Sequence, residues 1–321
     1  MYEVAPLFDH VAEGPANGAA HWVKTTDGYR IRVAHWTTPE MKGTVLLFPG
    51  RTEYIEKYGR DAVTMQENGF ATVTIDWRGQ GLADRLDSNR LLGHVHAFQD
   101  YQHDVRAMVH YAKAMNLPRP FFLLAHSMGG CIGLRSLHDG LEVCAAMFSA
   151  PMWGIHMPSA LRPLAWGIST LSRPLGFSTM LAPGQNEETY VLRAEFDENS
   201  LTSDPDMFDY MRRQLIAHPE LALGGPTLNW LNQALVEMRR LRSLTPPDVP
   251  TFTALGTDEA IVDPARVKQV MSRWTNGRLE MFEGARHELL MELPATRNKV
   301  FAKMFQHFRQ YLTQNCRANH A

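Results

Sequence analysis

The chain has 321 residues, of which 45% are hydrophobic and 21% charged, as in folded globular proteins rather than disordered or fibrous ones. Its 32 lysines and arginines against 34 aspartates and glutamates leave a net charge of -2. The chain therefore has no basic excess with which to neutralise the phosphates of a nucleic acid. No signal peptide is visible at the N-terminus, and no uncharged apolar run reaches the about 18 residues of a membrane span. We expect a cytoplasmic protein with no nucleic-acid partner.

Strand and helix patterns alternate in the first part of the chain. A hairpin is predicted over 21–34, with Thr26, Asp27 and Gly28 as its turn. Apolar, β-branched runs predict strands at 44–48, 71–75, 121–125 and 143–149, and helical spacing predicts helices at 58–68, 99–114 and 130–137. This alternation indicates the α/β class with a mostly parallel sheet.

The pattern changes between residues 151 and 245, where helical segments separated by Pro and Gly replace the strands. Strand patterns return at 249–255 and 278–282, and a helix over 295–312 closes the chain. We therefore divide the chain into three parts. Residues 1–150 form the first part of an α/β core, 151–245 an inserted helical cap, and 246–321 the second part of the core.

A candidate nucleophile, Ser127, stands at the end of an apolar strand and directly before a helix, in the segment FFLLAHSMGG. This arrangement is typical of a nucleophile elbow, a tight turn that requires small residues two positions before and after the serine. Ala125 and Gly129 occupy these positions, and the usual glycine is missing at the first. An elbow would aim the backbone N–H of Met128 at a developing oxyanion. A chance serine between strand and helix is the alternative.

A serine hydroxyl needs a base to accept its proton and an acid to orient that base. His287, after the last predicted strand, is the candidate base. Asp258 and Glu259 both follow the penultimate strand, so either gives the chain order serine, acid, histidine that this fold requires. The backbone N–H of Arg51, in the loop after the 44–48 strand, is the candidate for a second oxyanion donor.

No metal or organic cofactor is expected. The segment that runs from Arg78 to Gly81 lacks the third glycine of a dinucleotide site. Several histidines have no accompanying carboxylate motif and are expected on a solvated helix face: His94, His96, His103 and His110.

With these residues assembled, the chain resembles the α/β-hydrolase superfamily, and within it the lysophospholipase and monoacylglycerol lipase branch, which includes serine aminopeptidase-like members. Four segments between Trp22 and Leu312 carry the resemblance: FPGRTEYIEKY, DWRGQGLADR, AHSMGG and EGARHELLMELPATRNKVF. Pro49 stands where the family usually has His. The resemblance places Glu259 at the acid position, where the family usually has Asp, and Asp258 stays a competitor.

The resemblance implies a serine hydrolase that cleaves lysophospholipids or monoacylglycerols through an acyl-enzyme. An apolar set in the cap fits an acyl chain, and Met152, Trp153 and Met157 are its candidate substrate-binding residues. The alternative enzymes are a short-chain carboxylesterase and an aminopeptidase-like amidase. A hypothesis outside the enzymes is a non-catalytic binding protein with the same fold. Transient contact of the cap with a membrane surface stays open, as does the oligomeric state.

Overall fold

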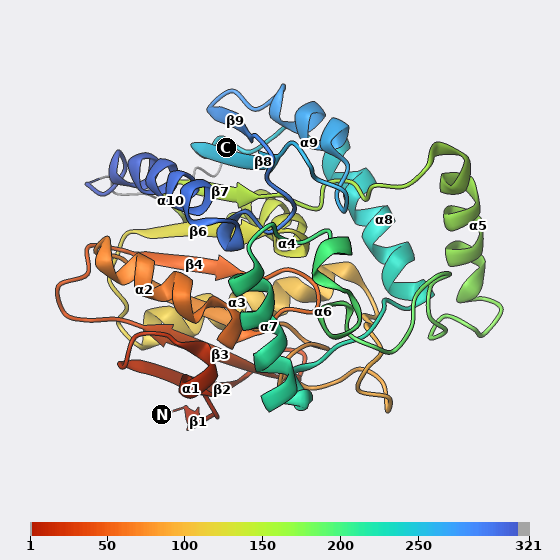
Figure 1. Cartoon of the computed structure of the whole chain (residues 1–321), viewed down its shortest axis with the longest axis horizontal. Helices are drawn as coiled ribbons and strands as arrows, with labels where there is room; N and C mark the ends of the chain where they lie inside the picture. Colours follow the sequence, from red (N-terminus) through yellow and green to blue (C-terminus); the bar gives the residue numbers. More distant parts are fainter. Residues whose placement is uncertain (1, 314–321) are drawn as a thin grey trace.

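A nine-stranded sheet forms the centre of the computed structural model, which describes residues 2–313 (Figure 1). The strands lie in the order β1-β2-β3-β5-β4-β6-β7-β8-β9. Their bounds are β1 (Glu3–Val4), β2 (Gly18–Lys24), β3 (Arg30–Trp36), β4 (Thr44–Phe48), β5 (Ala71–Asp76), β6 (Phe121–His126), β7 (Ala146–Ser149), β8 (Thr251–Gly256) and β9 (Gly277–Phe282). β1, β2, β3 and β5 pair antiparallel, and all pairs from β5 to β9 are parallel.

Helices cover both faces of this sheet, as its central strands require. Every residue of β4, β5, β6 and β7 is buried, because apolar runs in parallel strands must be shielded on two sides. The helices of the core are α1 (Asp9–Ala12), α2 (Gly59–Glu67), α3 (Tyr101–Ala114), α4 (Met128–His138), α9 (Pro264–Met271) and α10 (Pro294–Arg309). α2 and α10 lie together on one face, and α3 and α4 lie together on the other (Figure 1).

Four helices follow between β7 and β8: α5 (Arg162–Ser172), α6 (Tyr190–Arg193), α7 (Pro205–Ala217) and α8 (Leu228–Ser243). The arrowheads of β4 and β7 point toward this group, so it lies beyond the carboxyl ends of the parallel strands (Figure 1). α5 projects furthest and leaves apolar side chains in solvent, with Leu164 57% and Leu171 55% exposed. Within residues 2–313, no helix is long and apolar enough to cross a membrane.

The predicted fold class is confirmed. The hairpin and the strand over 44–48 lie where the sequence predicts them. The strand predicted over 143–149 begins only at Ala146, because the backbone N–H of Val143 turns back to donate to the carbonyl of Leu141. β1 and α1 were not predicted, since two and four residues are too few for a periodic pattern.

Candidate active site

Ser127 occupies a strained turn between β6 and α4. Its backbone φ of +48° and ψ of -117° fall outside the regions that side-chain-bearing residues prefer. A Cβ added to Gly129 would lie 2.1 Å from the carbonyl oxygen of Phe48, so this turn packs too closely on β4 for any larger residue. Ala125 replaces the usual glycine at the other small position. Its methyl fits because Gly133 faces it, where a Cβ would lie only 3.2 Å away.

The structure brings the side chains of Ser127, His287 and Glu259 into one hydrogen-bonded row. His287 Nε2 lies 2.9 Å from Ser127 Oγ, and His287 Nδ1 lies 2.7 Å from Glu259 Oε2. The other carboxylate oxygen of Glu259 accepts hydrogen bonds from the backbone N–H groups of Ile261 and Val262. Burial favours the neutral carboxyl, but His287 and these two donors hold the pKa of Glu259 below its ordinary value. Glu259 is thus kept as a carboxylate beside the imidazole.

The competing acid, Asp258, and the other carboxylate of this segment, Asp263, do not contact His287. Asp258 is exposed, and its carboxylate accepts a hydrogen bond from the Thr257 hydroxyl at 3.4 Å. Asp263 caps α9 and accepts from the backbone N–H of Ala265 at 3.0 Å. Only Glu259, among these three, has a carboxylate oxygen within 4.0 Å of His287 in the described part of the chain.

Two backbone N–H groups beside Ser127 are free to bind an anion. Neither the N–H of Met128 nor that of Arg51 donates to any acceptor in residues 2–313. The loop that carries Arg51 is held from both sides. Gln80 donates to the carbonyl of Gly50 at 3.0 Å and accepts from the N–H of Thr52 at 3.2 Å.

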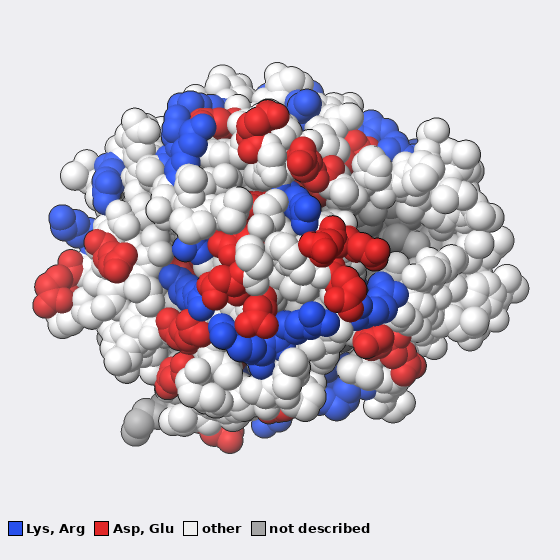
Figure 2. Space-filling model, in the orientation of Figure 1, with Lys and Arg blue, Asp and Glu red and all other residues white. Residues whose placement is uncertain are grey.

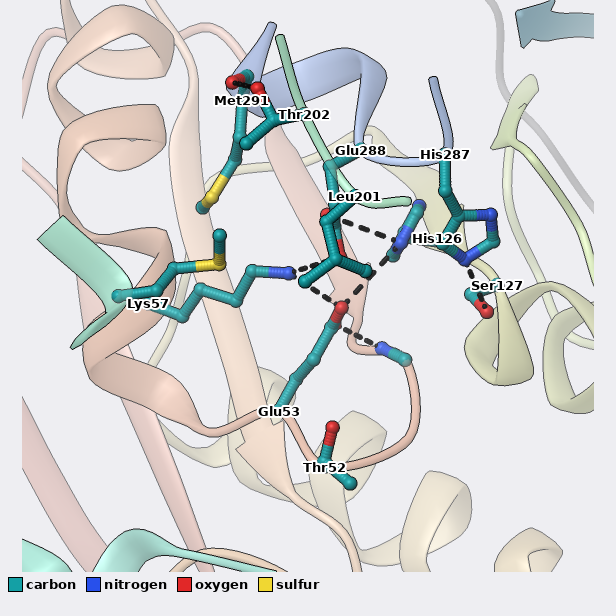
Figure 3. A network of polar contacts seen from close by, with 12 residues as sticks. Thr52, Glu53, Lys57, His126, Ser127, Leu201, Thr202, His287, Glu288 and Met291 are labelled. Atoms are coloured by element: carbon teal, nitrogen blue, oxygen red, sulfur yellow. Dashed lines mark hydrogen bonds and ion pairs between the residues drawn. The ribbon is translucent and has the colours of Figure 1, made fainter. Parts of the chain in front are cut away.

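Four buried charged side chains form a network next to this row (Figure 3). The quartet consists of Glu53, Lys57, His126 and Glu288. Lys57 Nζ lies 2.6 Å from Glu53 and 2.8 Å from Glu288, and His126 Nε2 faces the same carboxylates at 3.5 and 3.3 Å. Burial opposes the imidazolium form, but Glu288 and Glu53 raise the pKa of His126 above its ordinary value. The two carboxylates thus favour the imidazolium form of His126, opposite the ammonium group of Lys57.

The quartet was not predicted from the sequence, although a signal was available, because His126 precedes Ser127 and Glu288 follows His287. Three of its members, Glu53, His126 and Glu288, have ligand atoms close enough together to hold a metal ion. The ammonium group of Lys57 already lies between the two carboxylates, so the donor set does not favour a cation. Of the four histidines predicted on a solvated helix face, His96 and His110 are exposed, and one is not. His94 is buried and hydrogen-bonded to the Thr227 hydroxyl.

Two cavities meet at Ser127. The first, of about 470 Å³, is mostly apolar and is lined among others by Met152, Met157, Leu161, Leu164, Ile168 and Leu231. The second, of about 290 Å³, has a mixed lining that is more polar than that of the first, and we call it the polar cavity. Its wall includes Glu53, Lys57, Gln185, Thr189, Ser200 and Glu288, and also the apolar side chains of Val191, Leu201, Met211 and Leu215. Arg51 and Ser127 line both. A molecule bound at Ser127 can thus extend an apolar part to one side and a polar part to the other.

Of the three predicted substrate-binding residues, two line the apolar cavity and one does not. Met152 and Met157 lie on its wall. Trp153 is only 1% exposed and lies in the core, where its ring stacks on Trp274 and its Nε1 donates to the carbonyl of Gly130 at 3.1 Å. Trp153 therefore lines neither cavity, because its indole packs in the core against Phe148 of β7 and Trp274.

Comparisons with known proteins identify a family and several relatives of this chain. A family model described as Serine aminopeptidase, S33 matches residues 39–294. Lysophospholipase L2 of Escherichia coli is 29% identical over 299 residues, which cover 89% of this chain and 86% of that protein. A probable lysophospholipase L2 of Haemophilus influenzae is 28% identical over 283 residues, 87% of this chain and 88% of that one. A soluble variant of monoglyceride lipase from Saccharomyces cerevisiae, solved with a substrate analog, shares the fold with a TM-score of 0.70 at 24% identity, over 91% of this chain and 95% of that one.

Proposed function

The chain belongs to the serine aminopeptidase S33 family of α/β-hydrolases, and from this premise we propose that it is a serine ester hydrolase acting on lysophospholipids or monoacylglycerols. The relatives named lysophospholipase and monoglyceride lipase support ester hydrolysis. The observation that carries the proposal is the 2.9 Å contact between Ser127 and His287 at the point where an apolar and a polar cavity meet.

In the proposed mechanism, Ser127 Oγ attacks the ester carbonyl while His287 Nε2 accepts its proton. Glu259 fixes the imidazole tautomer by accepting from Nδ1 and stabilises the imidazolium that forms. The free N–H groups of Met128 and Arg51 bind the oxyanion, an effect worth about 3 kcal/mol per donor. His287 then gives its proton to the leaving alcohol, and an acyl ester remains on Ser127. Water, activated by the same histidine, releases the acid and restores the hydroxyl.

The substrate class rests on the two cavities. A single acyl chain placed in the apolar cavity gains about 0.8 kcal/mol for each buried methylene, which favours long chains over short ones. The polar cavity, with hydroxyl, amide and charged side chains, suits the glycerol portion of the alcohol. Residues 151–245 supply much of both linings, and we assign them the role of a cap over Ser127.

The cap also offers a surface for lipid. Figure 2 shows few charged side chains over the lobe formed by α5. Exposed apolar side chains of this lobe include Leu161, Leu164, Leu171, Leu175 and Met180, each at least half exposed. A contiguous apolar patch of this kind is typical of a contact with another surface. We include transient contact with a membrane surface in the proposal, since single-chain lipids would be collected there.

The test is hydrolysis of p-nitrophenyl esters from acetate to palmitate by the wild type and by Ser127→Ala. We expect activity that rises with chain length in the wild type and is lost in the variant. Equal activity in both proteins would overturn the serine mechanism, and a preference for acetate would overturn the lipid substrate. Faster cleavage of an aminoacyl p-nitroanilide than of any ester would favour an amidase.

A pair of cap variants tests the place of the acyl chain. Ala165 lines the apolar cavity, whereas Ala160 is exposed and lies outside both cavities. Ala165→Phe should shift the preferred acyl chain length of the ester toward shorter chains, because the ring takes the space of several methylenes. Ala160→Phe should leave the optimum where it is. An unchanged optimum in Ala165→Phe would mean that the chain lies elsewhere.

A further inference from the structure

Arg51 presents a cation to the candidate active site that no carboxylate neutralises. Within residues 2–313, no carboxylate oxygen lies within 4.0 Å of its guanidinium. Its single hydrogen bond goes from Nη1 to the carbonyl of Gly224 at 2.9 Å. An arginine has five N–H donors, so most of its donors remain available. The residue lines both cavities together with Ser127, and its guanidinium lies on the side of Trp230, a residue of the apolar cavity.

The guanidinium is held in position by its surroundings. Its carbon lies 5.6 Å from the ring centroid of Trp230, which lines the apolar cavity. Gly93 allows the close approach, because a Cβ there would lie 2.7 Å from Arg51 Nη1. Gly93 also forms an isolated β-bridge with Pro226, and its N–H donates to the carbonyl of Gly225 at 3.0 Å. Backbone from two distant parts of the chain thus holds the guanidinium in place.

The charge of Arg51 is not cancelled by the other ionised groups of the polar cavity. Glu53 and Glu288 already face Lys57 and His126 within the quartet (Figure 3). Burial lowers the pKa of Arg51 to about 10, which still leaves the guanidinium protonated at neutral pH. A desolvated cation of this kind gains most from an anionic ligand. Of the two Lys or Arg side chains that line the cavities in residues 2–313, Lys57 is paired with carboxylates and Arg51 is not.

We infer that the Arg51 side chain binds the phosphodiester of a lysophospholipid head group and thereby favours lysophospholipids over monoacylglycerols. The inference rests on the proposed function and narrows its substrate class. Arg51 would then act through both its parts. Its backbone N–H faces the ester carbonyl, and its side chain reaches the phosphate, which a glycerol backbone separates from that ester. Arginine suits this task because its planar fork matches phosphate oxygens. A monoacylglycerol has only hydroxyl groups to offer at this place.

The test compares kcat/KM for 1-palmitoyl lysophosphatidylcholine and 1-palmitoylglycerol in identical mixed micelles. Arg51→Met should lower the ratio of kcat/KM for lysophosphatidylcholine to kcat/KM for palmitoylglycerol by about tenfold or more. Only the lysophospholipid loses charge-assisted hydrogen bonds to its phosphate in this variant. Arg51→Lys should keep much of the ratio. Gly93→Ala should also lower the ratio, because the added methyl displaces the guanidinium while Arg51 stays in the chain. Thermal unfolding of each variant checks that it folds.

Different failures give different results. An unchanged ratio in Arg51→Met, with both esters still cleaved, would overturn the role of Arg51 and leave ester hydrolysis standing. Activity of Ser127→Ala on either lipid would overturn the proposed function itself. Glycerol 3-phosphate should inhibit the wild type more strongly than Arg51→Met. If Arg51 instead held the fatty-acid product, Arg51→Met would relieve inhibition by palmitate with both substrates and leave the ratio unchanged, which would also overturn the inference.

Discussion

The carboxylate of Glu288 lies 2.8 Å from the ammonium group of Lys57, although the residue before it, His287, faces Ser127. Adjacent residues thus belong to two different networks. The same holds for His126, which joins the quartet while the next residue is the nucleophile of the proposed mechanism. Glu53 connects the quartet to a third loop, because its carboxylate accepts a hydrogen bond from the backbone N–H of Gly50, next to Arg51. The quartet therefore links the three loops that carry the proposed reaction.

Loss of Lys57 should destabilise the protein. Lys57→Met leaves two buried carboxylates with His126 as their only counter-charge, so the free energy of unfolding should fall by about 3–5 kcal/mol. Urea denaturation followed by tryptophan fluorescence measures the change. Lys24→Met, at an exposed position, is the matched control and should differ little from the wild type. Equal stability of the Lys57 variant and the control would show that the quartet does not stabilise the fold.

The identity of the acid can be decided by two amide substitutions in one loop. Glu259→Gln keeps the shape of the side chain but removes the charge that orients His287, so kcat on a p-nitrophenyl ester should fall by about 10²- to 10⁴-fold. Asp258→Asn should leave kcat near that of the wild type, because Asp258 is exposed and does not contact His287. The reverse order of effects would assign the acid to Asp258.

Asp61 should make stability depend on pH. Burial raises the pKa of this α2 carboxyl from 3.8 to about 8, and one of its oxygens has no hydrogen-bond partner in the described chain. Because the folded pKa lies above the unfolded one, Asp61 costs stability progressively as pH rises from about 4 to 8. Asp61→Asn cannot ionise and should therefore be more stable than the wild type at pH 8, with the difference vanishing near pH 4.

Chemical denaturation at several pH values measures that difference. Glu67→Gln, an exposed carboxyl in the same helix, is the control and should show no such trend. A constant difference between Asp61→Asn and the wild type from pH 4 to pH 8 would show that Asp61 titrates normally in the folded protein.

The turn at Ser127 should tolerate Ala125, in place of the usual glycine, only because residue 133 is also a glycine. Gly133→Ala would bring two methyl groups to 3.2 Å and crowd Leu123 and Phe148, so it should cost about 1–3 kcal/mol of unfolding free energy. In an Ala125→Gly background the same substitution should cost less, because one of the two methyls is gone. A double-mutant cycle measures this coupling. Purely additive effects would mean that the two positions are accommodated independently.

Much of the fold could be predicted from the sequence, because the central strands are buried on both faces and read as short apolar runs. The comparisons confirm the predicted family resemblance. The serine and the histidine could be named because each follows a strand in a fixed chain order. That order fits Asp258 and Glu259 equally, and only the family resemblance favoured Glu259. Trp153 was misplaced because an indole is equally suited to a core and to a lipid cavity. The quartet was missed because its charges compensate one another only in three dimensions, between residues far apart in the chain.

The meeting of two unlike cavities at Ser127 has a consequence for the order in which products depart. In the proposed mechanism, cleavage at the junction would leave the alcohol in the polar cavity and the acyl group, still attached to Ser127, in the apolar one. The space that the alcohol vacates would then be the space that water enters to reach His287, so departure of the first product would have to precede release of the fatty acid.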